Sequence, residues 1–77
     1  MENYEYVLLT TEQKIETLNQ RILGIEELHF RVTMDKLDAE ANEDAASREK
    51  SEGVLRTLEN QLENAKAQLK ALGVSEE

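Results

Sequence analysis

The chain has no cysteine, no proline and no tryptophan, and only three glycines, two tyrosines and one phenylalanine among its 77 residues. The lack of cysteine excludes a disulfide framework and a thiolate site, and it leaves the redox compartment undetermined. Because the chain has no proline, it contains no residue that would force a helix to kink or end. A chain this short and this poor in aromatic residues is one domain at most and a poor candidate for a globular core of its own. We therefore expect it to fold with partners.

Long apolar runs and basic clusters are also missing. No segment approaches the roughly 18 apolar residues of a membrane span, and the N-terminus lacks the basic region of a signal peptide. Nine lysines and arginines are scattered among seventeen acidic residues, which gives a net charge of -8. No basic stripe is therefore present to bind phosphates or anionic lipid. We expect a cytoplasmic protein that binds neither nucleic acid nor membranes.

Residues that commonly carry catalysis are sparse. His29 is the only histidine, and no serine, second histidine or glycine-rich phosphate loop is arranged with it to support chemistry. The acidic run over residues 35–44 lacks the central glycine and the alternating ligands of a calcium loop, and a solvated helix face explains it better. The sequence therefore predicts no enzyme activity, no cofactor and no metal site.

What the sequence does contain is a long helical pattern with a recognisable beginning and end. Thr10 and Gln13 have the spacing of a capping box, in which each side chain binds the backbone amide of the other residue. Gly73 can take a left-handed conformation after the last turn, and Val74 can then pack back on Leu69 as in a Schellman motif. These signals predict a helix that begins after Thr10 and ends close to Gly73.

We therefore predict an all-α protein built from one long coiled-coil helix over residues 10–72. An extended apolar leader over residues 1–9 precedes this helix, and an acidic tail over residues 73–77 follows it. The leader is either a docking arm or a tail that folds onto the end of the bundle. The candidates for docking on a partner are Tyr4, Tyr6 and Leu8.

Apolar residues repeat at alternating steps of three and four, which is the spacing of a coiled-coil seam. The first series is Ile15, Leu18, Ile22, Ile25, His29 and Val32. The second series is Leu23, Glu27, Phe30, Met34, Leu37, Ala41, Leu55, Leu58, Leu62, Ala65, Leu69 and Leu72. Residues 22–37 belong to both series and are apolar on two faces, as a helix between two neighbours requires. The pattern predicts a homo-oligomeric bundle, and we favour a trimer.

His29 lies at a seam position, where a symmetric oligomer would bring several copies together. Such a cluster is suited to a metal site or to a pH switch. A polar layer that fixes the register of the helices is the simpler interpretation, and we favour it.

The middle of the chain, residues 39–53, leaves a structural alternative open. Its alanine and glutamate content and the unbroken heptad count favour a continuous helix, although Gly53 inside a helix costs about 1 kcal/mol. Alternatively, a turn at residues 42–44 would start a second helix. Such a hairpin would lay residues 55–72 beside the two-faced segment 22–37. We take the continuous helix as the first interpretation and the hairpin as its alternative.

Three short stretches resemble the small, acidic, helical tail-fibre assembly chaperones of tailed phages. They are TEQKI at residues 11–15, TLNQRIL at residues 17–23, and LKALGV at residues 69–74 with the acidic tail. Proteins of that family are small homo-oligomers that help long fibre proteins to trimerise and are absent from the finished fibre. The resemblance implies a non-enzymatic coiled-coil assembly factor in the host cytoplasm, with a fibrous protein as partner and no catalytic residues.

Two other functions fit the same pattern. One is a permanent structural spacer or scaffold component of a larger particle. The other, which we favour less, is a small acidic protein that blocks a basic surface of its partner.

Overall fold

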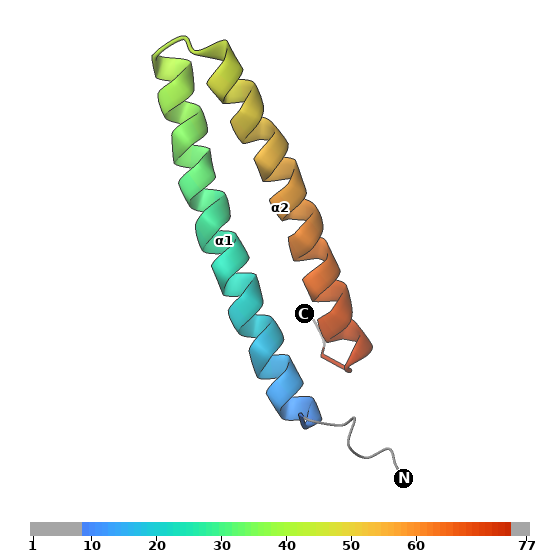
Figure 1. The fold of residues 1–77 in the computed structure, drawn as a ribbon. Helices are drawn as coiled ribbons and strands as arrows, with labels where there is room; N and C mark the ends of the chain where they lie inside the picture. The colour runs from blue at the N-terminus through green and yellow to red at the C-terminus, as the bar shows by residue number, and fades with distance from the viewer. Residues whose placement is uncertain (1–8, 75–77) are drawn as a thin grey trace.

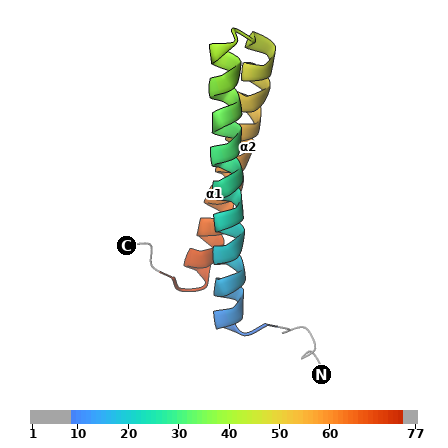
Figure 2. The same ribbon diagram turned by 90° about the vertical axis from the view of Figure 1, so that its left-hand side faces the viewer.

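The computed structural model describes residues 9–74, which form two helices joined by a tight turn (Figure 1). Helix α1 spans Thr11–Ala41 and helix α2 spans Ala45–Ala71. The helices run antiparallel and pack against each other, as the view in Figure 2 also shows. Residues 9–74 are therefore an all-α helical hairpin. Residues 1–8 of the predicted leader and residues 75–77 of the predicted acidic tail lie outside the described residues.

The predicted all-α class is confirmed, and the hairpin is the alternative that the structure adopts. The continuous helix over residues 10–72 is wrong, because the chain reverses at residues 42–44. Glu43 takes the left-handed conformation, with φ of 56°. The amide of Asp44 then donates to the carbonyl of Ala39 at 2.8 Å, and the amide of Glu43 donates to the carbonyl of Glu40 at 3.1 Å. These two bonds form a Schellman motif that ends α1.

Asp44 also begins the second helix. Its carboxylate accepts from the backbone amide of Ser47 at 3.1 Å and from the hydroxyl of Ser47 at 2.8 Å. Asp44 is thus the N-cap of α2. One residue therefore closes α1 and opens α2, so the chain reverses without a long loop. This reversal gives the apolar faces of the two helices a partner within the same chain.

The two outer helix ends are formed as the sequence predicts. Thr10 caps α1, since its hydroxyl accepts from the amide of Gln13 at 3.1 Å and its own amide donates to the Gln13 side chain at 3.0 Å. At the end of α2, Gly73 has φ of 95°. The amide of Val74 donates to the carbonyl of Leu69 at 3.1 Å. The capping box and the Schellman motif are both confirmed.

The core is one row of side chains between the helices. The first series of α1 faces the part of the second series that lies in α2. The buried residues are Ile25, Ala39, Leu58, Ala65 and Leu69. The half-buried apolar residues beside them are Ile15, Leu18, Ile22, Val32, Leu55, Leu62 and Leu72. A pair of helices can bury only one face of each, so this core is thin.

Candidate interaction surface

Helix α1 carries a second apolar face that α2 does not cover. Because each helical residue advances by about 100°, the second series lies about 150° around α1 from the first. Figure 2 looks onto α1 with α2 behind it, which is the side of α1 that faces away from α2. We call the residues of the second series that lie on α1 the outer seam. Its members are Leu23, Glu27, Phe30, Met34, Leu37 and Ala41.

The large side chains of the outer seam are strongly exposed. The exposed fraction is 55% for Leu23, 63% for Phe30, 42% for Met34 and 56% for Leu37. Phe30 and Met34 line a shallow hollow on the surface of α1. Three charged residues, Glu26, Glu27 and Arg31, line the same hollow. The outer seam is therefore mostly apolar, with Glu27 as its one charged member, and Glu26 and Arg31 lie on its flanks.

The prediction that residues 22–37 are apolar on two faces is confirmed. One face packs on α2 and the other is the outer seam. The structure divides the residues predicted to form the oligomerisation seams into two groups. Those that line the contact between α1 and α2 of the same chain are Ile15, Leu18, Ile22, Ile25, His29, Val32, Leu55, Leu58, Leu62, Leu69 and Leu72. Those that remain exposed are Leu23, Phe30, Met34 and Leu37.

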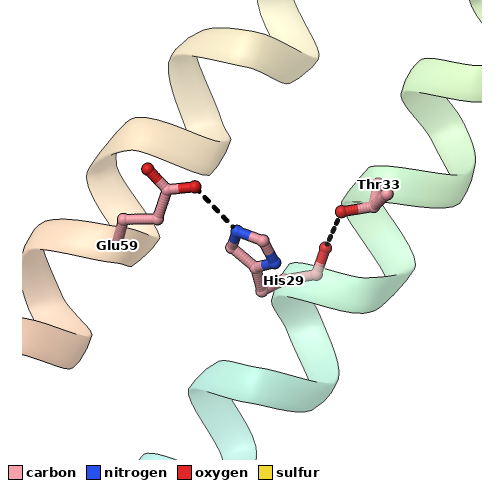
Figure 3. A network of polar contacts seen from close by, with 3 residues as sticks. All are labelled: His29, Thr33 and Glu59. Carbon is pink, nitrogen blue, oxygen red and sulfur yellow. Dashed lines mark hydrogen bonds and ion pairs between the residues drawn. The ribbon is translucent and has the colours of Figure 1, made fainter.

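His29 lies in the contact between the helices and makes a polar link to α2. Its Nε2 atom is 3.0 Å from Oε2 of Glu59 (Figure 3). The hydroxyl of Thr33 donates to the carbonyl of His29 at 2.8 Å. The sequence places His29 in a seam between copies of the chain, as a polar layer that fixes register or, less favoured, as a metal site or pH switch, whereas in the structure His29 contacts Glu59 of the same chain. Within residues 9–74 no group of three or more histidine and acidic side chains is arranged to hold a metal ion.

A second polar contact between the helices, an ion pair, lies one heptad away. The Nζ atom of Lys36 is 3.6 Å from Oε2 of Glu52. His29 and Lys36 are one heptad apart on α1, and Glu52 and Glu59 are one heptad apart on α2, in the opposite chain direction. The two pairs therefore support a single antiparallel register. The roles of Lys36, Glu52 and Glu59 do not follow from the sequence alone, because which residues pair depends on where the chain turns.

No family model, no curated protein and no solved structure matches the chain. Among the described residues, neither helix is long and apolar enough to cross a membrane. The docking candidates Tyr4, Tyr6 and Leu8 lie outside the described part of the chain. The outer seam of α1 is therefore the candidate functional surface.

Proposed function

We propose that this protein is a non-enzymatic, homo-oligomeric assembly factor that associates through the outer seam of α1. The observation that carries the proposal is the exposure of Leu23, Phe30, Met34 and Leu37 at coiled-coil spacing. A contiguous apolar surface of this kind is typical of a site for protein association. Its spacing fits another helix better than it fits a small molecule.

The thin core supports the same conclusion. The described helices bury five apolar side chains, and three of these belong to α2. Burying a leucine, methionine or phenylalanine side chain contributes about 1.5–3 kcal/mol. Burying the large side chains of the outer seam would therefore contribute a free energy of the same order as the burial of the hairpin core. We propose a trimer, in which each α1 lies between its own α2 and neighbouring copies.

The proposed client is a long fibrous protein that trimerises. The resemblance of residues 11–15, 17–23 and 69–74 to tail-fibre assembly chaperones supports this choice. The function needs no catalytic residue, cofactor or metal.

The hairpin also bears on the alternative of a permanent spacer. A spacer gains from length, and a continuous helix over residues 10–72 would extend about 90 Å at 1.5 Å per residue. Helix α1 has 31 residues, and at the same rise it extends about 45 Å. Folding back halves the reach, which favours the assembly factor. Purification of the mature assembly separates the two functions, because an assembly factor is absent from it and a spacer is present.

Phe30→Asp tests self-association directly. Phe30 points away from α2 and is 63% exposed, so the substitution leaves the hairpin contact intact. An aspartate in the outer seam would place an unpaired charge in the oligomer contact. We expect the light-scattering mass to fall to the 8.8 kDa of one chain, with association weakened about tenfold or more. The far-UV circular dichroism spectrum should remain helical.

Ala67→Asp is the matched control, since it adds the same charge to an exposed position of α2. It should leave the oligomer intact. Leu62→Asp should instead disrupt the hairpin itself, because Leu62 is half-buried against α1. If Phe30→Asp keeps the oligomeric mass of the parent chain, the outer seam is not the association surface and the proposal is wrong.

A further inference from the structure

We infer that the outer seams of neighbouring copies pack in parallel and in register, so that all hairpin turns lie at the same end of the assembly. The occupant of the outer seam is then the same face of α1 in a second copy of this chain. This inference rests on the proposed self-association and specifies its orientation. It is carried by the order of apolar and charged residues along α1.

The outer seam matches itself well in this arrangement. In a parallel, in-register pair of helices each seam residue meets its own equivalent. Leu23, Phe30, Met34 and Leu37 would each lie at the level of the same residue in the second copy. Only Glu27 places like charges at one level. The full length of the seam is used, from Leu23 to the end of α1 at Ala41.

The flanking charges favour the parallel orientation. Relative to the outer seam, Glu26 and Arg31 occupy the g and e positions of a heptad, which in parallel coiled coils pair between chains. Glu26 of one copy therefore faces Arg31 of the next copy. Both residues are exposed and lie at the hollow formed with Phe30. Among the described residues, neither forms an ion pair with another part of α1 or α2.

An antiparallel pairing with full overlap places like charges together. In that orientation e positions face e positions and g positions face g positions. Arg31 would face Arg31 of the second copy, and Glu26 would face Glu40. Like charges across an interface oppose association. An antiparallel shift by one heptad toward the turn would pair Arg31 with Asp38, but it would leave Leu23 uncovered.

Cysteine substitution at the far end of the seam distinguishes these orientations. The described chain contains no cysteine, nor does the rest of the sequence, so Leu23→Cys introduces a single thiol. Only a parallel, in-register oligomer brings two copies of residue 23 together. We expect Leu23→Cys to form disulfide-linked dimers on a non-reducing gel after mild oxidation. Ala41→Cys, at the opposite end of the seam, should do the same.

An antiparallel oligomer gives a different result. Neither variant would then cross-link alone, and a mixture of Leu23→Cys and Ala41→Cys would cross-link between the two. This result, or the absence of every cross-link from variants that light scattering shows to be oligomeric, overturns the parallel arrangement and leaves the proposed function standing. A parent chain that stays monomeric overturns both.

Charge reversal supplies a second test that does not depend on disulfide geometry. Glu26→Arg and Arg31→Glu each place like charges across the parallel contact. Each should raise the dissociation constant of the oligomer by roughly threefold to tenfold. The double variant Glu26→Arg/Arg31→Glu restores opposite charges and should recover the affinity of the parent chain. Two single variants that associate as tightly as the parent, or a double variant weaker than both, would contradict the pairing.

Discussion

Asp44 is the residue on which both helix ends at the turn depend. Its backbone amide satisfies the carbonyl of Ala39 at the end of α1, and its side chain satisfies the amide of Ser47 at the start of α2. The hydroxyl and then the backbone amide of Ser47 hold the pKa of the Asp44 carboxyl below its usual value of 3.8. Since the pKa is lowered in the folded chain, the ionised form of Asp44 stabilises the hairpin.

The sign of this effect gives a pH prediction. The contribution of Asp44 is fully present above pH 3.8, the value for the unfolded chain, and it is lost as the pH falls through the lower pKa of the folded state. Asp44→Asn keeps a good N-cap residue but carries no charge. The parent chain should melt at a higher temperature than Asp44→Asn near neutral pH, and this difference should shrink below about pH 4.

Comparison with Asp44→Asn removes the effect of the other carboxylates, which titrate in both chains. The measurement is thermal unfolding followed by circular dichroism at one chain concentration. Asp44→Ala, which cannot cap the helix, should melt lower than Asp44→Asn at every pH. A difference between the parent and Asp44→Asn that does not change with pH would show that the Asp44 charge does not stabilise the hairpin.

At the scale of the helices, the local signals were predictable and the pairing was not. The capping box at Thr10 and the Schellman motif at Gly73 depend on residues within one turn, and both are confirmed. The turn is harder to predict, because Glu43 adopts a left-handed conformation that a glutamate rarely takes. The heptad count continues across residues 39–53 in either architecture, so it does not distinguish a continuous helix from a hairpin.

The candidate site was likewise only partly predictable. The two-faced character of residues 22–37 follows from their spacing alone, and the structure confirms it. Which face meets α2 depends on the position of the turn, since the turn decides what lies opposite each residue. For the same reason, the contact between His29 and Glu59 could not be predicted, since these residues are thirty positions apart in the sequence and meet only once the turn is placed.

Two glycines, one inside α2 and one just after it, provide a prediction at this scale. Gly53 lies inside α2, and a Cβ atom added there would meet no other atom within 4 Å. Gly53→Ala should therefore raise the free energy of unfolding by about 0.5–1 kcal/mol, because alanine loses less backbone entropy in a helix. Urea unfolding followed by circular dichroism, at one chain concentration, measures the change.

Gly73 is the matched control for the same substitution. It has φ of 95° at the end of α2, where an alanine side chain would be strained. Gly73→Ala should lower the free energy of unfolding by about 1 kcal/mol. If Gly53→Ala lowered the free energy of unfolding, the assignment of Gly53 to a helix interior would be contradicted. If Gly73→Ala raised it, the assignment of Gly73 to a left-handed cap would be contradicted.

At the scale of the whole molecule, folding and association are expected to be one linked process. The described hairpin has a single row of buried side chains and no buried polar residue. The outer seam of α1 leaves four large apolar side chains in contact with water. A self-associated state that covers this seam would stabilise the folded chain, so we expect a higher protein concentration to stabilise the fold by mass action.

The unfolding transition of the parent chain should therefore depend on protein concentration. Each tenfold increase in concentration should raise the free energy of unfolding by up to about 1 kcal/mol per chain, and the melting temperature should rise with it. Phe30→Asp should melt lower and independently of concentration, since its hairpin has no partner. Circular dichroism melts over a hundredfold range of concentration, together with light scattering at each concentration, measure both effects. A parent chain that melts cooperatively at the same temperature throughout this range, and that scatters as a monomer, would mean that the hairpin is stable alone. Self-association through the outer seam would then be wrong.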